Sequence, residues 1–391
     1  MTTTFAVDRA DLRRTRWLES AAAPVEPGAA RLRIERFAPT SNDVTYGAFG
    51  EAMHYWDFYP TGDPATGCIP VWGFATVSES RCAGVDAGGR FYGHFSMADD
   101  VVLQPARIDS SGFFDAAPRR RELASVYNRY LRCRTDPPYR EGEEGLIALL
   151  RPLFITSFLI DDFLADNAFF GAQRVLISSA SSKTAYSLAF CLDARRQTSE
   201  KIASLGLASP ANLEFTRSLG CYNDVLTYES ASRLDAEPPA VYVDMSGNTG
   251  LRATIHDVLR DRLVYSCSVG GTHWQELGSG KGLPGPRPVL FFAPAQVKKR
   301  IAEWGSAGLD ERLASAWRAF VARCRIRSSR GCGSSKVWGA MRLHPPTRPF
   351  WTVRCRPTKA VCFACEEPRF LTPQLLRTAS DMKSRTRWRA S

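Results

Sequence analysis

Short buried strands and helices alternate along the second half of the sequence, between residues 151 and 281. Apolar runs of strand length are separated by stretches in which apolar residues have helical spacing. The strand-like runs are 174–178, 201–207, 224–228, 240–245 and 263–269. Strand–helix–strand units with short connections form parallel sheets through right-handed crossovers. This half therefore predicts a doubly wound, Rossmann-like α/β domain.

The first half of the chain has a different pattern. Its strand-like runs alternate apolar and polar residues or are rich in β-branched and aromatic residues, with glycine turns between them. They cover residues 31–37, 71–80, 84–95 and 101–108. The chain has 391 residues, enough for two domains at about 100–200 residues each. We therefore expect a β-rich domain at 1–150 and the α/β domain at 151–322.

The last 69 residues differ from the rest in charge. Residues 323–391 hold 13 Arg, 3 Lys and 3 acidic residues, a net charge of +13. The whole chain carries +11, so residues 1–322 carry −2 and are close to neutral. Five of the 11 cysteines also lie in this tail. The excess of basic residues therefore belongs to the tail and not to the predicted domains.

The tail also loses the periodicity that precedes it. Residues 309–322 have the apolar spacing of a helix, and the pattern stops there. Arg, Cys, Trp, Ser and Pro dominate the tail, as in GC-rich DNA translated out of frame. In the minus-one frame, residues 350–365 can read as an ordinary chain end that finishes in an apolar strand and a stop. We predict that 323–391 is a non-native or disordered tail produced by a frame shift.

The alternative is a genuine basic arm that binds nucleic acid or anionic lipid. Cys362 and Cys365 have C-x-x-C spacing, but no second such pair accompanies them, so we expect no metal there. On the frame-shift hypothesis, nucleic acid is not a partner.

Composition places the remainder among ordinary globular proteins. Hydrophobic residues make up 44% and charged residues 23% of the chain. The N-terminus lacks the apolar segment of a secretory signal, and the longest apolar stretch, 153–170, contains Asp161, Asp162 and Asp166. We therefore expect a cytoplasmic protein without a membrane span, whose six cysteines outside the tail are reduced.

Spaced glycines in the first half carry a resemblance to a known fold. The matching positions are Gly73, Val77, Val85, Gly88 or Gly89, Arg90 and Gly93. They resemble the small GroES-like β-barrel domain of the medium-chain dehydrogenase/reductase superfamily, in its zinc-free, quinone-reductase-like branch. The runs NDVTY, YWDFYP, SFLIDDFL and SSASSKTA further resemble a domain-of-unknown-function family over residues 30–322. The resemblance implies an α/β protein with this small barrel followed by the Rossmann-like domain.

A dinucleotide-binding turn should follow the first strand of the second domain. Here the turn, 178–185, contains Ser and Ala where glycines are expected, although a helix N-terminus can still attract a pyrophosphate. No acidic residue ends the second strand to bind a ribose hydroxyl, which favours NADPH over NADH. The predicted cofactor-binding residues are Ser179, Ser181, Lys183, Thr184, Ser209, Asn212, Ser246, Gly247 and Gly270, the last three in turns that resemble the family's nicotinamide-side loops.

The resemblance also implies the catalytic candidates. Asn42 and Tyr46 lie in the loop that faces the nicotinamide in quinone reductase-like proteins. Tyr55 belongs to an aromatic run, 54–59, that either packs beneath the barrel or lines the substrate cleft and donates to a carbonyl. The zinc ligands of related enzymes have no counterpart, because the potential ligands Cys68, Cys82, His54 and His94 lack ligand spacing, and we expect no metal.

These features lead to two hypotheses. The first is an NADPH-dependent, zinc-free oxidoreductase acting on a carbonyl or activated alkene of a small-molecule substrate. The alternative, favoured by the missing glycines, is a non-catalytic or divergent protein on the same fold that has lost dinucleotide binding. The apolar run 291–294 would either close over the cleft or seal a homodimer, and the sequence leaves both open.

Overall fold

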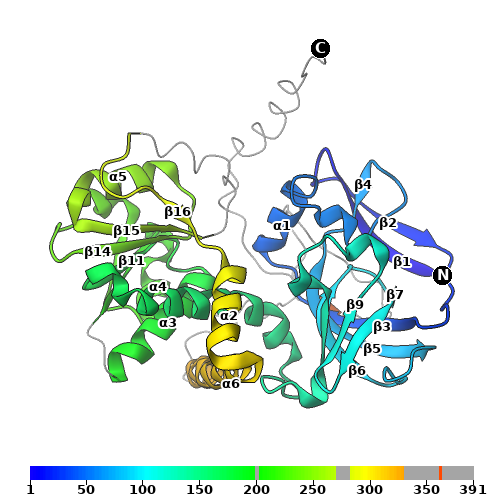
Figure 1. Cartoon of the computed structure of the whole chain (residues 1–391). Coiled ribbons are helices and arrows are strands. Elements are labelled where there is room, and N and C mark those ends of the chain that lie inside the picture. The colour runs from blue at the N-terminus through cyan, green and yellow to red at the C-terminus, as the bar shows by residue number, and fades with distance from the viewer. Residues whose placement is uncertain (199–201, 270–281, 330–360, 363–391) are drawn as a thin grey trace, which may run out of the picture. The chain divides into compact units, whose positions relative to one another are not determined.

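The computed structural model describes residues 1–198, 202–269, 282–329 and 361–362, with the backbone alone at 41, 42, 44, 45, 325–329 and 361–362. The chain divides into two compact units (Figure 1). The first unit comprises Met1–Leu149 together with Arg327–Ser391, and the second unit comprises Leu150–Ile326.

Two β-sheets form the first unit. The smaller has the order β2 (Thr15–Ser20), β1 (Thr2–Asp8), β4 (Thr66–Gly67). The larger has the order β17 (Val361–Cys362), β3 (Ala30–Phe37), β5 (Val71–Ser80), β6 (Arg90–Phe95), β10 (Arg129–Arg132), β9 (Gly112–Asp115), β8 (Pro105–Asp109), and β7 (Asp100–Leu103) also pairs with β3. All these pairs are antiparallel except β17 with β3.

The glycines of the resemblance have two different structural roles. Gly88 adopts φ +83° in the turn between β5 and β6, a backbone conformation that residues other than glycine rarely adopt. Gly73 and Gly93 instead allow close packing. A Cβ at Gly73 would lie 2.4 Å from the Arg36 carbonyl oxygen, and one at Gly93 would lie 2.4 Å from the Tyr130 ring. These positions therefore have a structural role in the curled sheet.

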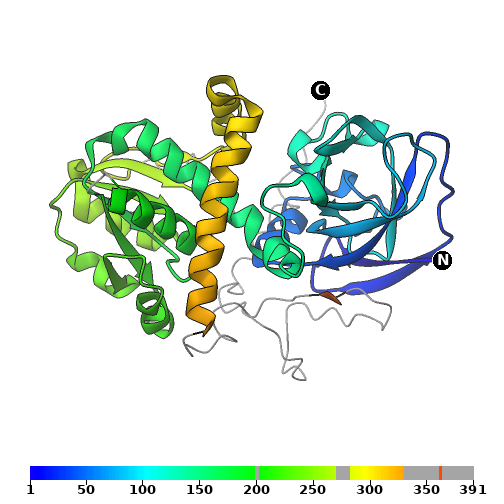
Figure 2. The same cartoon turned by 90° about the horizontal axis from the view of Figure 1, so that it is seen from below.

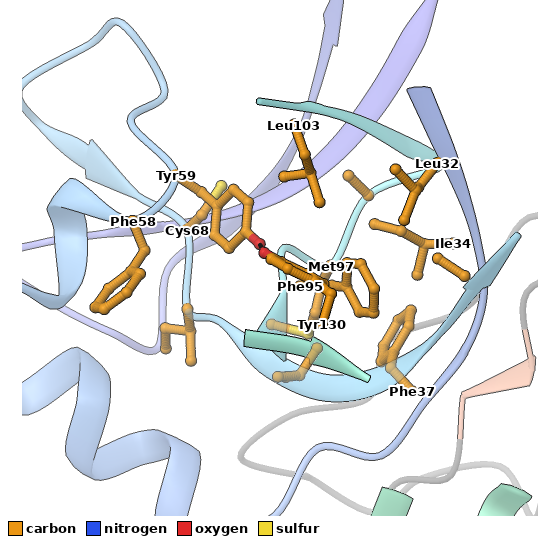
Figure 3. Close-up of a cluster of buried hydrophobic side chains, with 14 of the residues drawn as sticks. Leu32, Ile34, Phe37, Phe58, Tyr59, Cys68, Phe95, Met97, Leu103 and Tyr130 are labelled. Carbon is orange, nitrogen blue, oxygen red and sulfur yellow. Dashed lines mark hydrogen bonds between the residues drawn. The ribbon is translucent and has the colours of Figure 1, made fainter. Parts of the chain in front are cut away.

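Aromatic and aliphatic side chains from the two sheets fill the core of the first unit (Figure 3). A small cluster of polar side chains lies among them. The hydroxyls of Tyr59 and Tyr130 are 2.9 Å apart, and both donate to the backbone oxygen of His94. Arg120 is fully buried beside them, and its Nε lies 2.9 Å from Asp115 Oδ2, as an ion pair that lacks hydrogen-bond alignment.

The second unit is built on one parallel sheet. Its order is β13 (Asp224–Thr227), β12 (Ala203–Ala208), β11 (Arg174–Ile177), β14 (Ala240–Asp244), β15 (Leu263–Ser268), β16 (Val289–Leu290). Every neighbouring pair is parallel. Numbered along the chain, this order is 3-2-1-4-5-6, which is the order of dinucleotide-binding Rossmann folds. The predicted doubly wound sheet is confirmed.

Helices cover both faces of this sheet. Helices α3 (Lys183–Thr198) and α4 (Leu213–Ser218) lie on one face and α5 (Thr249–Leu259) on the other (Figure 1). Helix α2 (Glu144–Asp166) starts in the first unit and continues into the second. Asp161 and Asp162 of α2, two of the charged residues in the apolar stretch 153–170, are both buried. They pair with Arg195 and Arg300.

The last helix, α6 (Ala293–Ser329), runs against the helices of the second unit (Figure 2). The amphipathic helix predicted at 309–322 lies within it, and its Phe320 ring packs 4.9 Å from that of Phe154. The helix continues past residue 322 to Ser329. The frame-shift hypothesis stays a prediction, because most of the tail lies outside the described residues. Within the described residues, no helix is long and apolar enough to cross a membrane.

Candidate functional site

The turn between β11 and α3 occupies the place of a dinucleotide-binding loop. Ser179 adopts φ +51° there, a left-handed conformation that usually requires glycine. The serine thus takes the backbone geometry that the missing glycine would have supplied. Tyr228, which directly follows β13, hydrogen-bonds to Ser179, and this bond lowers the Tyr228 pKa while burial raises it. The turn is tight without the glycine motif.

Neighbouring strand ends hold the same turn in place. The Tyr222 hydroxyl donates to the Ala180 carbonyl oxygen at 2.8 Å, and Asn212 Nδ2 donates to Ser181 Oγ at 3.2 Å. A Cβ at Gly206 would lie 2.9 Å from the Ala180 methyl, so the backbone of β12 approaches the turn closely. Two residues predicted to bind the cofactor, Ser181 and Asn212, are therefore brought together by the fold.

Buried polar groups bridge the ends of β11 and β14, the two strands at which the chain order reverses. Ser178 Oγ donates to Asp244 Oδ1 at 2.9 Å and accepts from the backbone N–H groups of Met245 and Ser246. Arg252 of α5 donates to Asp244 Oδ2 through Nε at 2.9 Å and approaches it through Nη2 at 2.8 Å. This reversal point is where open α/β sheets bind their ligands. The Ser178–Asp244–Arg252 network ties the two ligand-side turns together there.

The remaining predicted cofactor residues surround this edge of the sheet. Lys183 and Thr184 begin α3 and are partly exposed. Ser209 follows β12, and its Oγ is buried without a hydrogen-bond partner in the part of the chain that the structure describes. Ser246 and Gly247 both donate backbone N–H groups to Asp244 Oδ1. Gly270 lies outside the described residues.

A second cluster, which we call the aromatic cluster, lies in the first unit. The rings of Tyr46, on α1 (Ser41–Ala48), and Tyr55, on the 3-10 turn η1 (Tyr55–Asp57), have centroids 4.5 Å apart. Both side chains are buried. The cluster also contains Phe58, Trp72, His94 and Tyr127. The aromatic residues of the run 54–59 are buried in the core, while His54 and Asp57 are exposed. Whether Tyr46 and Tyr55 face a substrate stays a prediction.

Hydroxyl groups link the tyrosines of this cluster. The hydroxyls of Tyr55 and Tyr127 are 3.4 Å apart, and Tyr46 hydrogen-bonds to Tyr127 as well. Burial raises the pKa of Tyr46, Tyr55 and Tyr127 above the ordinary phenol value. The phenols therefore stay protonated near neutrality and can act as hydrogen-bond donors.

Asp43 adds a carboxyl group to the aromatic cluster. Its side chain is buried, and burial raises its pKa to about 7 against the opposing hydrogen bonds from Thr40. A charged Asp43 also raises the pKa of Tyr46 and of Tyr127. Asp43 is therefore a buried carboxyl group with a pKa near neutrality whose charge acts on two phenols of the cluster.

His94 lies within this cluster and is fully buried. Its ring centroid lies 4.6 Å from that of Tyr127 and 5.1 Å from that of Trp72. Within the described residues, neither ring nitrogen has a hydrogen-bond partner. Burial and the nearby Arg120 charge hold the His94 pKa well below its usual value, so the ring is neutral.

Two of the potential metal ligands in the first unit, Cys68 and His54, have other partners. Asn42 lies on α1 beside Asp43, and its side chain is outside the described residues. Cys68 is buried, with its Sγ directed at the Phe5 carbonyl oxygen, and His54 is an exposed partner of Asp57. Among the described residues, no group of three or more His, Cys, Asp or Glu side chains could hold a metal ion.

Sequence reasoning missed Asp43, Tyr127 and the Ser178–Asp244–Arg252 network. Asp43 stands in the NDVTY run that supplied Asn42 and Tyr46, so the adjacent carboxyl was the available signal. Tyr127 follows Tyr55 by 72 residues, and nothing in its local sequence marks it. Asp244 ends an apolar strand, which places it at the ligand edge of the sheet, but its pairing with Arg252 depends on the fold.

A protein family matches most of the chain. The model described as "Protein of unknown function (DUF2855)" matches residues 37–343. The chain belongs to this family. The search of curated proteins found no match.

Solved structures resemble this DUF2855 member in fold. CurA from Vibrio vulnificus is similar with a TM-score of 0.50 and 9% identity, over 87% of this chain and 96% of that one. The quinone oxidoreductase from Coxiella burnetii has a TM-score of 0.45 and 11% identity, over 82% of this chain and 95% of that one. S. aureus TarJ in complex with NADPH has a TM-score of 0.47 and 10% identity, over 81% of this chain and 88% of that one. The predicted α/β architecture, with a curled antiparallel sheet and a six-stranded parallel sheet, is confirmed, and CurA shares this fold.

Proposed function

We propose that this chain is an NADPH-dependent, zinc-free oxidoreductase that reduces a carbonyl or activated alkene of a small molecule. The observation that carries the proposal is the edge of the second unit's sheet. Its strand order is 3-2-1-4-5-6, and the tight turn after β11 leads into the N-terminus of α3. Such a helix start offers backbone N–H groups and a positive dipole end to a pyrophosphate.

The residues at this edge fit a phosphorylated dinucleotide. The sequence after β12 is Ser209-Pro210, without the carboxylate that would repel a 2′-phosphate. Ser209 Oγ is a buried hydroxyl whose hydrogen-bonding capacity the described residues leave unused. Lys183 would add a positive charge at the start of α3. These groups support NADPH over NADH.

The bound cofactor would supply a hydride, and the protein must supply a proton. The aromatic cluster contains the groups suited to that task, because its buried phenols are protonated donors at neutral pH. Tyr46 and Tyr55 are accordingly the residues that we assign to hydrogen-bond and protonate the substrate oxygen or carbon. Neither role needs a metal ion.

One observation favours the alternative of a protein without dinucleotide binding. Ser178 and Ser181 of the turn already hydrogen-bond to Asp244 and Asn212. These two side chains are engaged within the protein, so pyrophosphate binding would rest on backbone N–H groups and Lys183.

Fluorescence titration of the full chain with NADPH, and with NADH in parallel, tests the proposal. We expect micromolar NADPH binding, tighter than that of NADH. Lys183→Ala and Ser209→Ala should each weaken NADPH binding by about tenfold, equivalent to about 1.4 kcal/mol. Lys298→Ala, which removes an exposed lysine of α6, is the matched control and should bind as the wild type does. Binding of neither nucleotide at millimolar concentration would leave the non-dinucleotide alternative.

A further inference from the structure

The edge of β3 that faces away from β5 loses its partner strand part-way along. β5 pairs with the other edge from Ala30 to Phe37. On the outer edge, β7 pairs only with Ala30–Arg33, and the last backbone bond there runs from the Ile34 N–H group to the Asp99 carbonyl oxygen at 2.9 Å. Unpaired N–H and C=O groups on a strand edge are a template for another strand. The stretch of β3 after Ile34 is therefore a place for strand addition.

Both faces of this stretch are already occupied by the first unit. Phe37 is buried, and its ring lies in the core (Figure 3). Glu35 and Arg36 instead form ion pairs, Glu35 with Arg90 at 2.5 Å and Arg36 with Glu144 at 3.6 Å. Because the side chains are engaged, a partner of this stretch must bind along its backbone, as a neighbouring strand does.

A short strand of the tail lies on this edge. β17 (Val361–Cys362) runs parallel to β3, with Val361 opposite Arg36 and Cys362 opposite Phe37 (Figure 2). It has two residues, whereas strands in globular proteins usually have about five or six. The edge therefore accepts a strand parallel to β3, and the tail of the present chain fills it with a pairing shorter than usual.

The position of β17 coincides with the apolar strand of the minus-one reading frame. In that frame each codon joins the third base of one residue to the first two bases of the next. The codon that joins Val361 to Cys362 then ends in TG and reads Val, Leu or Met, whatever its first base. The codon that joins Cys362 to Phe363 reads Leu or Phe, and the next reads Arg or Cys. The codon that joins Ala364 to Cys365 again reads Val, Leu or Met.

These four residues fit the edge better than those of the present frame. Side chains of a strand alternate between the two faces of a sheet. With the second residue beside Phe37, the second and fourth face the core, and both are large and apolar for every choice of third base. The third, Arg or Cys, faces the opposite side. A continued β17 in the present frame would place Phe363 on that outer face and the small Ala364 on the core face, and it would bury less apolar surface.

We propose that the outer edge of β3 is the docking site of a C-terminal strand of the chain itself, and that the minus-one frame encodes the strand that fits it. The strand runs parallel to β3 and closes the edge that β7 leaves open, which protects the sheet from pairing with other chains. β17 is the part of this pairing that the present frame retains. The inference rests on the frame-shift hypothesis and on the pairing of β17 with β3, and it is independent of the proposed reductase function.

Hydrogen exchange followed by mass spectrometry tests the docking with two full chains. Both share residues 1–329, and one continues with the present tail while the other continues in the minus-one frame. Amides at 34–38 should exchange at least about tenfold more slowly in the minus-one chain, because a longer strand holds the edge. Amides at 174–178, in the second unit, should exchange equally in both chains and show that both are folded. Exchange at 34–38 that is no slower in the minus-one chain would overturn the proposal.

Two substitutions in the minus-one chain test the alternation of the strand. Asp in place of the residue beside Phe37 brings a charge to the core face, and it should return the exchange at 34–38 to the rate of the present chain. Asp in place of the third strand residue, on the outer face, is the matched control and should leave the protection intact. An effect of both substitutions, or of neither, would overturn the proposed strand. Protection that increases with protein concentration would show that a second copy covers this edge, and it would overturn the proposal as well.

Discussion

The two units each bury an aspartate next to a candidate site, in opposite ways. Asp244, in the second unit, accepts bonds from Ser178, from the N–H groups of its own turn and from Arg252. Asp43, in the first unit, accepts bonds from Thr40, and within the described residues it forms no ion pair. The Asp244 carboxylate has a buried cationic partner, and the Asp43 carboxyl group has none within the described residues.

This difference separates a structural role from a chemical one. A buried charge with a well-aligned partner fixes geometry, because removing the partner leaves an uncompensated charge. A buried acid without a cation exchanges its proton near neutrality, which is useful only where protons move. Asp244 therefore holds the ligand-side turns of the sheet, and the Asp43 carboxyl group is the one whose charge should change near neutral pH.

The largest effect on stability should come from breaking the ion pair between Asp244 and Arg252. Arg252→Met keeps an unbranched apolar stem but removes the charged partner of Asp244. It should lower the free energy of unfolding by about 3–5 kcal/mol, measured by urea denaturation with circular dichroism. Arg217→Met removes an ion pair with Glu214 in which both side chains are largely exposed, and it should cost less than about 1 kcal/mol. Equal effects of the two substitutions would show that Asp244 is not a buried anchor.

An intermediate effect on stability should come from Asp43, and it should depend on pH. The Asp43 pKa is raised to about 7 in the folded protein from a model value of 3.8. The folded state thus holds an extra proton between these values. The stability that Asp43 contributes is fully present below about pH 4 and is lost as the pH rises through about 7.

Asp43→Asn removes this dependence. Between pH 5 and pH 8 the wild type should lose roughly 2–3 kcal/mol of stability relative to Asp43→Asn, since each pKa unit corresponds to about 1.4 kcal/mol. Urea denaturation at the two pH values measures the difference, and Asp57→Asn serves as the control. A wild type that gains stability relative to Asp43→Asn over this interval would mean that Asp43 is ionised throughout, as in an ordinary capping box.

The sequence predicted the second unit more fully than the first. Apolar strand runs and the Ser-rich turn predicted the doubly wound sheet. Ser181 and Asn212 lie together at its edge, and their cofactor-binding role stays a prediction. These features are local, because a strand and the turn that follows it are consecutive in the chain. The neighbouring strand ends that hold the turn, with Tyr222 and Tyr228, depend on the strand order and could not be predicted from the local pattern.

In the first unit the sequence indicated Tyr46 and Tyr55 but not what surrounds them. Tyr127 lies on η3 (Ser125–Asn128) and His94 lies on β6. Both elements are distant in sequence from Tyr46 and Tyr55. Whether Asp43 is buried or exposed also leaves no mark in the sequence, since the same NDVTY run would suit a solvated helix cap. Burial decides the chemistry of this carboxyl group, and burial is a property of the tertiary structure.

The smallest effect on stability should come from His94. Its substitution tests whether a buried ring without hydrogen-bond partners in the described residues stabilises the folded state. Its folded pKa is depressed, so the unfolded chain binds a proton below about pH 6.5 that the folded chain does not. Stability is therefore lost as the pH falls below that value. His94→Phe should change stability by less than about 1.5 kcal/mol at pH 8, because the substitution nearly conserves volume. Relative to the wild type, His94→Phe should be roughly 1 kcal/mol more stable at pH 5.5 than it is at pH 8. His54→Asn, at an exposed histidine, should show no such gain. A His94→Phe protein that is much less stable at pH 8 would reveal that the ring nitrogens have partners in solution, and His94 would then belong with Asp244 among the paired groups.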